Sequence, residues 1–126
     1  MSQTRDGRRR QGQEAEEAAA RYLTRKGLKV VTRNFHCRGG ELDIVAWDAE
    51  TLVFVEVRFR GNGSFENPME SVTPNKQQRV IRAASVYLQK QGLWQAPCRF
   101  DVIAITPGRW RRFRAQWIQH AFDATQ

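Results

Sequence analysis

The sequence lacks any apolar run long enough to cross a membrane, and it contains few cysteines. No stretch approaches the roughly 20 consecutive apolar residues that a membrane-spanning helix needs, and residues 1–17 (MSQTRDGRRRQGQEAEE) have no apolar core of the kind found in signal peptides. We therefore expect a cytoplasmic protein without membrane association. The two cysteines, Cys37 and Cys98, are far apart in the chain, and we expect them to stay reduced rather than form a disulfide.

Common motifs for zinc and for nucleotide phosphates are also missing. His36 and Cys37 lie far from Cys98 and His120 in sequence, without the C-x-x-C or H-x-x-x-H spacing of a structural zinc site. No glycine-rich loop with Walker or dinucleotide-binding spacing follows a predicted strand. The sequence thus disfavours both a structural zinc site and a nucleotide-cofactor site.

Acidic residues are scarce relative to basic ones. The 126 residues include 21 Lys and Arg but only 13 Asp and Glu, which gives a formal net charge of +8. This excess predicts a polyanionic partner, and arginine, which outnumbers lysine, suits two-pronged contact with phosphate. We expect a nucleic acid, with DNA favoured over RNA. The alternative is a basic protein that adheres to polyanions without specificity, which the charge alone would equally produce.

Length and apolar patterning indicate one α/β domain. A chain of 126 residues with 40% hydrophobic residues can form one core but is short for two ordinary domains. We expect a flexible basic arm over residues 1–12 and a single domain over residues 13–126. Periodicity and turn residues predict the order αβββαβ, followed by a short strand with a final helical turn, over residues 13–26, 28–32, 40–48, 51–60, 75–91, 98–105 and 109–122. Residues 33–39 are predicted as a loop.

The segments at residues 40–48 and 51–60 form a predicted hairpin that carries the most informative charges. With residues 49–50 as the turn, the numbers of facing residues sum to 99, which puts Asp43 opposite Glu56. Directly opposed carboxylates repel each other, so this pairing costs stability unless a cation, a proton or water relieves it. The hairpin therefore predicts a cation site.

The same register places Glu41 opposite Arg58. A solvated sheet face would explain alternating charges, but both faces of the predicted hairpin are apolar near its turn, so the charges gather at one end, where sites occur in α/β proteins. A third acid, Glu16, lies on the packing stripe of the first predicted helix. It either points toward Asp43 and Glu56 or simply favours the positive end of the helix dipole.

Taken in order, these motifs resemble those of a nuclease superfamily. Glu16, GELD at residues 40–43 and EVR at residues 56–58 resemble the PD-(D/E)XK superfamily, which includes restriction endonucleases and archaeal Holliday-junction resolvases. More closely, the chain is similar to the YraN family of small bacterial proteins within that fold, from Gly12 through RFDV at residues 99–102. The shared stretches are RNF at 33–35, GGELDIVA at 39–46, LVFVEVRFR at 52–60 and SVTPNKQ at 71–77.

The resemblance implies a restriction-endonuclease-like fold, in which helices flank a mixed central β-sheet. It also implies a Mg²⁺- or Mn²⁺-dependent endonuclease that hydrolyses phosphodiester bonds in DNA, with structured or branched DNA among its candidate substrates. The predicted metal ligands are Asp43 and Glu56, because carboxylate oxygens suit Mg²⁺. The predicted catalytic residues are Glu16, Asp43, Glu56 and Arg58.

Arg58 departs from the superfamily pattern, which has lysine at this position. A guanidinium group stays protonated and cannot act as a base, but it can orient a phosphate or stabilise developing charge. Arginine also occurs here in some members of the family that the chain resembles.

The alternative to an active enzyme is a non-catalytic nucleic-acid-binding module that keeps the nuclease scaffold. A third class is an assembly adaptor whose basic charge serves a protein partner. Junction cleavage would require a homodimer.

Basic side chains outside the acidic cluster are candidates for nucleic-acid contacts. The predicted set is Lys76, Arg79 and Arg82 on the second predicted helix, and Arg109, Arg111 and Arg112 near the C-terminal segment. In residues 109–114 the arginines interleave with aromatic residues, a combination that can hold phosphates and stack unpaired bases. An edge strand with its apolar residues turned inward would produce the same alternation.

Arg99 and Asp101 share one strand face and predict a structural ion pair outside the site.

Overall fold

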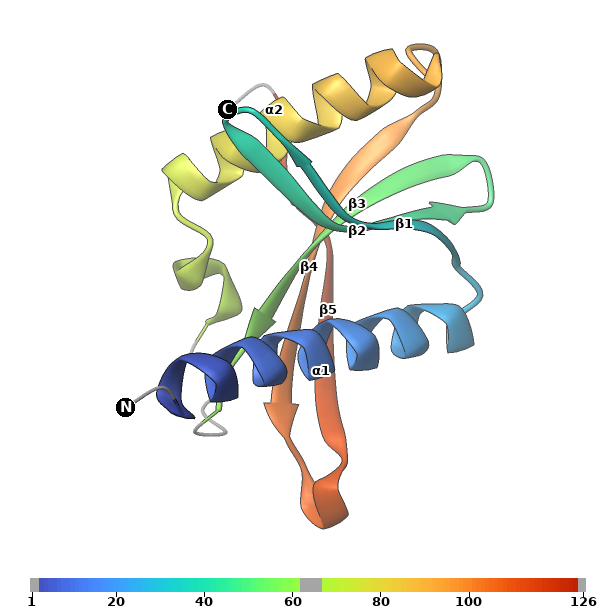
Figure 1. Ribbon diagram of the computed structural model, residues 1–126. Helices are drawn as coiled ribbons and strands as arrows, with labels where there is room; N and C mark the ends of the chain where they lie inside the picture. Colours follow the sequence, from blue (N-terminus) through green and yellow to red (C-terminus); the bar gives the residue numbers. More distant parts are fainter. Residues whose placement is uncertain (1–2, 62–66, 125–126) are drawn as a thin grey trace.

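The computed structural model describes residues 3–61 and 67–124, with only the backbone described at residues 3–9, 11 and 111 (Figure 1). The main elements are α1 (Gln3–Arg25), β1 (Lys29–Cys37), β2 (Gly40–Asp48), β3 (Thr51–Phe59), α2 (Pro74–Gln91), β4 (Cys98–Pro107) and β5 (Phe113–Phe122). Two short 3₁₀ segments, η1 (Pro68–Ser71) and η2 (Arg109–Arg111), lie before α2 and between β4 and β5. In the described part of the chain, no helix has the length and apolarity to span a membrane.

A five-stranded mixed sheet forms the centre of the protein, with the spatial order β1-β2-β3-β4-β5. Neighbouring strands are antiparallel except β3 and β4, which run parallel. A parallel pair needs a long crossover connection, and α2 lies within the segment that supplies it. The resulting order αβββαββ and mixed sheet confirm the predicted α/β fold with a restriction-endonuclease-like layout.

The two helices cover opposite faces of the sheet (Figure 1). On the α2 face, the buried core includes Phe54, Tyr87 and Phe100. On the α1 face, buried residues such as Leu23 and Ile103 form a separate core. Because apolar side chains are needed on both faces, the central strands read as nearly continuous hydrophobic segments rather than as strict alternations.

Helix α2 covers the predicted residues 75–91 and begins one residue earlier, at Pro74. Thr73 is the N-cap, with its hydroxyl oxygen accepting a hydrogen bond from the Lys76 backbone N–H (3.2 Å), and Pro74 occupies the first turn. Gly92 ends the helix in the left-handed conformation, with φ of 66°. The capped first turn has a functional consequence, because it fixes the place at which the Lys76 side chain leaves the helix.

Three elements have boundaries that were predicted wrongly. Helix α1 begins at Gln3 rather than at residue 13, so residues 3–12 of the predicted flexible arm are helical, as the high helix propensity of Arg and Gln allows without apolar periodicity. Strand β1 continues through the predicted loop to Cys37, because those residues pair with β2 at the sheet edge. Strand β5 begins only at Phe113, because η2 occupies Arg109–Arg111, and it extends to Phe122 in place of the predicted helical turn, since it pairs with β4 along its length.

Candidate active site

The β2–β3 hairpin keeps the predicted register near its turn. The pairs from Asp48 with Thr51 to Ile44 with Val55 all follow the predicted sum of 99. Ala49, in the turn, has a positive φ of 53°, as a tight hairpin connection requires. The predicted hairpin is therefore correct over this part of both strands.

Beyond Ile44 the described ladder between β2 and β3 ends. The predicted pairing of Asp43 with Glu56 and of Glu41 with Arg58 is thus wrong, although the residues remain near one another. Here a side chain takes the place of the backbone pairing between the strands. The Oδ2 atom of Asp43 accepts a hydrogen bond from the Val57 backbone N–H (2.8 Å). The physical reason is the repulsion between opposed carboxylates, which an open hairpin end reduces.

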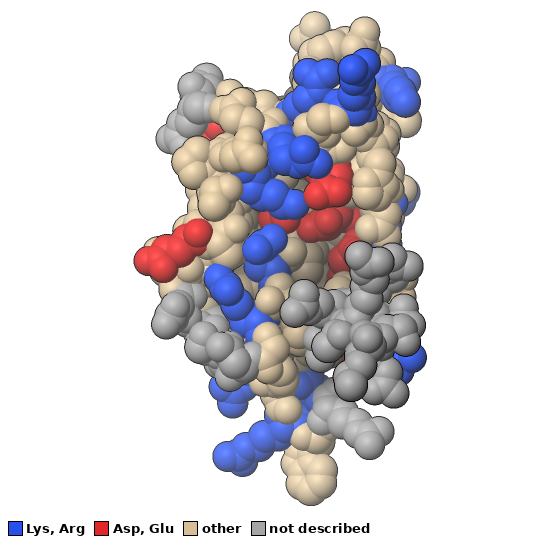
Figure 2. Space-filling view, turned by 60° about the vertical axis from the view of Figure 1, so that its left-hand side comes forward, with Lys and Arg blue, Asp and Glu red and all other residues tan. Residues whose placement is uncertain are grey.

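The predicted site residues converge on one pocket of about 210 Å³. Its lining includes Glu16 from α1, Asp43 from β2, Glu56 and Arg58 from β3, and Lys76 from α2. Elements far apart in the chain therefore bring all the predicted catalytic residues together. Figure 2 shows acidic side chains gathered in the middle of one face of the molecule, with Lys and Arg side chains above and below them.

The carboxylates of this pocket strongly affect one another. Burial, and next the charge of Asp43, raise the pKa of Glu56 to about 7, and only 2% of the Glu56 side chain is exposed. Burial also raises the pKa of Asp43, although the hydrogen bond from Val57 opposes this. The pKa of Glu16 is raised by burial and then by the charge of Asp43. The pocket thus holds excess negative charge that a cation or protons would relieve.

Asn34 of β1 holds Glu16 in place, a contact that sequence reasoning missed. With its amide nitrogen turned toward the carboxylate, Asn34 donates hydrogen bonds to both Glu16 oxygens (2.8 and 3.1 Å). Its φ of 55° is left-handed, a conformation that asparagine tolerates better than most residues. The available signal was the RNF motif, in a segment predicted as a loop.

Lys76 belongs to the acidic pocket rather than to the exposed basic side of α2. Its Nζ atom lies 3.0 Å from Oε1 of Glu41 and 3.5 Å from Oε1 of Glu56. Burial alone would lower the pKa of Lys76, but Glu56 and Glu41 outweigh this effect and raise it. Lys76 therefore remains protonated. Its place in the SVTPNKQ motif, just after a helix N-cap, was the signal that could have found it.

Arg58 provides a second cation at the pocket. Its Nη1 atom lies 3.6 Å from Oε1 of Glu56, and its Nε–H donates a hydrogen bond to the Ser71 hydroxyl (3.1 Å). Ser71 in turn donates to the Pro68 carbonyl oxygen (2.7 Å), so the η1 segment fixes this face of the guanidinium group. The other nitrogen atoms of Arg58 remain suited to phosphate.

The donor set fits a magnesium or manganese ion held by two carboxylates. The described residues include no group of three or more His, Cys, Asp and Glu side chains arranged to hold a metal together. Mg²⁺ is often held by one or two carboxylates and several waters, however, and Asp43 and Glu56 match that pattern. The buried Oε2 atom of Glu56 has no hydrogen-bond partner within the described structure, and this costs free energy that a cation would recover.

The other predicted basic residues lie outside the pocket. Arg79 and Arg82 are exposed on α2, where the Nε–H of Arg82 also donates to the Arg38 carbonyl oxygen (2.7 Å). Arg109 and Arg112 are exposed around the β4–β5 connection, whereas the Arg111 side chain lies outside the described residues. These positions separate into two basic regions, one on α2 and one near β5.

The predicted ion pair between Arg99 and Asp101 is confirmed. The Nε atom of Arg99 lies 3.1 Å from Oδ1 of Asp101, which is fully buried. Trp117 Nε1–H (2.9 Å) and the His120 backbone N–H (3.1 Å) also donate to this carboxylate. Asp101 is thus satisfied by β4 and β5 and contributes to their packing rather than to the acidic pocket.

The fold and the pocket define a small α/β protein with a restriction-endonuclease-like sheet and an acidic site at the open end of a hairpin. The chain belongs to the family described as Uncharacterised protein family UPF0102, whose model matches residues 15–105. It is similar to a UPF0102 protein of Marinobacter nauticus, with 52% identity over 120 residues that cover 95% of this chain and 98% of the relative.

Further relatives come from other bacteria. The chain is 45% identical over 115 residues to a UPF0102 protein of Pseudomonas putida, covering 90% of this chain and 94% of the relative. It is 46% identical over 116 residues to a UPF0102 protein of Symbiobacterium thermophilum, covering 92% and 98%. This membership agrees with the family predicted from the motifs, and the matched region contains the acidic pocket from Glu16 to Lys76.

Proposed function

We propose that this protein is a divalent-metal-dependent endonuclease that hydrolyses phosphodiester bonds in DNA. The observation that carries the proposal is the pocket in which the half-buried carboxylate of Asp43 and the buried carboxylate of Glu56 lie beside the cations of Arg58 and Lys76. Carboxylates suit a divalent cation, and fixed cations suit the phosphate that reacts there. Both requirements of phosphodiester hydrolysis are thus met in one place.

Asp43 and Glu56 are the residues that hold Mg²⁺ or Mn²⁺ in this proposal. When bound, the ion lowers the pKa of a coordinated water and offsets charge on the phosphate. Glu16 accepts a proton from the attacking water, because burial and the charge of Asp43 raise its pKa toward the range useful for proton transfer. Asn34 is a positioning residue, since its hydrogen bonds fix the Glu16 carboxylate.

Arg58 and Lys76 share the role that the superfamily assigns to a single lysine. Lys76 keeps its proton next to Glu41 and Glu56, so it supplies positive charge rather than a base. Arg58, anchored through Ser71, presents its outer nitrogen atoms to the phosphate in a two-pronged contact. The two cations orient the scissile phosphate and stabilise the charge that develops on it.

Cleavage assays test the proposal directly. Branched, flapped, single-stranded and linear DNA, with matched RNAs, are incubated with Mg²⁺ or Mn²⁺. At least one substrate is cut, and Asp43→Asn or Glu56→Gln abolishes cutting while largely sparing binding. Glu50→Gln, in the exposed β2–β3 turn, is the matched control and retains full activity. If no substrate is cut with either metal, and the acid variants bind nucleic acid as the parent does, the enzyme proposal fails.

Arg58→Lys probes the departure from the superfamily pattern. If the phosphate needs the two-pronged contact, the rate of cutting falls, whereas a maintained or higher rate means that arginine is a weaker substitute for lysine. The binding of substrate, measured without metal, separates a loss of affinity from a loss of turnover.

A second candidate function is a non-catalytic nucleic-acid-binding module on the same scaffold. The observation that favours it is the contact of Lys76 with Glu41 and Glu56, because an internal cation already relieves part of the acid repulsion. Such a module binds DNA with an affinity that falls as salt rises, since the net charge of +8 favours counterion release. It differs from the enzyme in cutting no substrate, and salt-independent binding would contradict both functions.

A further inference from the structure

Trp110 stands fully in solvent at the turn between β4 and β5. Its residue is 91% exposed, far more than Trp94 (58%) or Val31 (41%) among the exposed large hydrophobic residues described. The backbone of Trp110 is left-handed, with φ of 59° and ψ of 43°, which is costly for a bulky side chain. An indole this exposed gains little from packing, and the strained backbone that presents it to solvent points to a functional role.

Arginines surround this indole. Arg109, Arg112 and Arg114 line a depression of about 420 Å³ together with Trp110 and Phe113. Among the ion pairs found in the described structure, none includes these three arginines. The tip of the β4–β5 hairpin thus combines an aromatic face with several cations that remain available to an anion.

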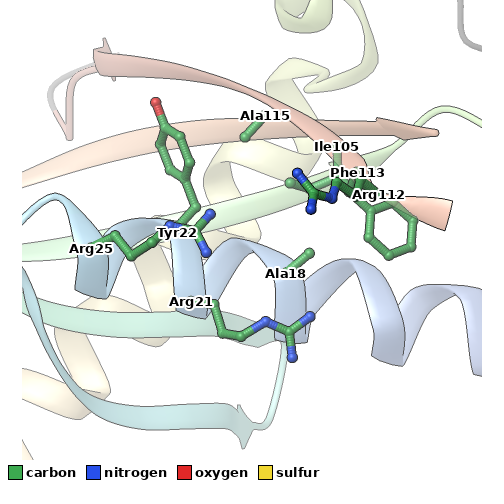
Figure 3. A pocket seen from close by; sticks show the side chains of 8 residues that line it. All are labelled: Ala18, Arg21, Tyr22, Arg25, Ile105, Arg112, Phe113 and Ala115. Carbon is green, nitrogen blue, oxygen red and sulfur yellow. The ribbon is translucent and has the colours of Figure 1, made fainter. Parts of the chain in front are cut away.

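A basic groove of about 550 Å³ lies next to this depression, between α1 and β5. Figure 3 shows Arg21, Tyr22 and Arg25 projecting from α1, with Arg112 and Phe113 on the other side of the groove. Arg112 and Phe113 line both hollows, which are therefore neighbours. Arg21 has only a long ion pair with Glu17 (3.8 Å), and both side chains are largely exposed, so this contact is weak.

An ordinary edge strand explains only part of this arrangement. In β5, Phe113 is half-buried while its neighbours Arg112 and Arg114 are exposed, as strand alternation requires. Trp110 precedes the strand and lies in η2, where that alternation does not apply. The exposed indole therefore remains the feature to be explained by function.

We propose that the hairpin tip and the groove bind single-stranded nucleic acid. Trp110 stacks on an unpaired base, while Arg25 and Arg112 contact the phosphates that follow it. Aromatic faces set among cations are how proteins hold single strands, whereas the bases of a duplex already stack on one another and leave no free face. The inference rests on the proposed action on nucleic acid, and it narrows the substrate to one that contains unpaired nucleotides, such as a flap, a gap or a junction.

Binding measurements in EDTA test this inference apart from cleavage. A short fluorescent single strand, as DNA and as RNA of matched sequence, is titrated with the protein, and the same DNA is titrated as a duplex. Trp110→Ala lowers single-strand affinity about 5-fold or more, and Trp110→Phe restores part of it because a ring remains. Trp94→Ala, which removes another exposed indole, is the matched control and leaves the affinity unchanged.

The proposed phosphate contacts in the groove lead to a separate prediction about salt dependence. Arg25→Gln reduces the slope of log affinity against log salt by about 0.7 for a single strand, the loss of one phosphate contact. Trp110→Ala leaves that slope nearly unchanged, since stacking releases no counterions. Repeating the titrations in the Asp43→Asn background separates the two proposals, because loss of cleavage there leaves the Trp110 effect intact. If Trp110→Ala binds a single strand as the parent does, or loses duplex affinity equally, the inference is overturned even if the protein cuts DNA.

Discussion

Glu56→Gln is expected to stabilise the metal-free protein at neutral and alkaline pH, although it removes a proposed metal ligand. Burial and the charge of Asp43 raise the pKa of Glu56 to about 7, whereas the unfolded chain titrates near 4.5. Between these values the folded state binds more protons than the unfolded state, so stability falls as pH rises. Glutamine keeps the shape of the protonated carboxyl group but does not ionise, so the variant avoids this loss of stability.

The magnitude follows from the shift in pKa. The difference between about 7 and 4.5 is 2.5 units, and at about 1.36 kcal/mol per unit this corresponds to about 3 kcal/mol. The attraction of Lys76 and Arg58 for the carboxylate is already contained in that pKa, because both lower it. A change of this size is a large part of the roughly 5–15 kcal/mol that stabilises an ordinary domain.

Urea unfolding in EDTA at several pH values measures the effect. The free energy of unfolding of Glu56→Gln should equal that of the parent below pH 4.5, exceed it progressively as pH rises, and lead by about 3 kcal/mol above pH 7. Glu50→Gln in the exposed turn is the control and shows no such trend. Added Mg²⁺ should stabilise the parent but not the Glu56→Gln variant, and so remove the difference in their free energies of unfolding. A difference that does not depend on pH, or a destabilised Glu56→Gln protein above pH 7, would refute the reasoning.

The remaining predictions concern the supports of the site. Asn34→Ala should slow cutting about tenfold or more while binding is retained, because the α1 carboxylate loses its hydrogen bonds; an unchanged rate contradicts the positioning role. Gly40→Ala should destabilise the fold by about 2–4 kcal/mol in urea unfolding, since its Cβ would lie 2.2 Å from the Arg79 carbonyl oxygen. Gly12→Ala, which meets nothing within 4 Å, is the control. Lys76→Gln should raise the carboxylate pKa values in the pocket, measurable by NMR titration without metal.

The elements with strong local signals were predictable from the sequence. Strands β2 and β3 begin at the predicted residues 40 and 51, and α2 ends at the predicted residue 91, one residue before the cap Gly92. Edge elements were harder, because β1 and β5 each pair on one side only and are partly exposed, which weakens their periodicity. The N-terminal turns of α1 carry no apolar stripe, so propensity was the only available signal.

The acids of the site were predictable because they share strand faces and one helix stripe, which are local properties. The position of Lys76 was not, since it depends on how the crossover packs α2 against the sheet. The role of Asn34 depends equally on tertiary structure, because β1 must bring it beside α1. The sequence therefore revealed the acids and Arg58 at the hairpin, but not the places of Lys76 and Asn34 beside them.

The departure of β2 from β3 at Ile44 explains how so many acids are accommodated at one place. A continued ladder would hold Asp43 and Glu56 directly opposed, and would leave no room for another group between them. Because the ladder ends, the Asp43 carboxylate takes up the Val57 N–H, and side chains from both helices reach the opening.

The charges at this opening then point to the kind of ion that suits it. Three carboxylates, Glu16, Asp43 and Glu56, line the pocket beside two cations, Lys76 and Arg58. Burial raises the pKa values of all three acids, so ionising them together in the metal-free protein is costly. A divalent ion suits such carboxylate oxygens, and its double charge relieves more of their repulsion than a monovalent ion would. The acids gathered at the opened hairpin are thus both the cause of the instability expected of the metal-free protein and the reason that a divalent ion should remove it.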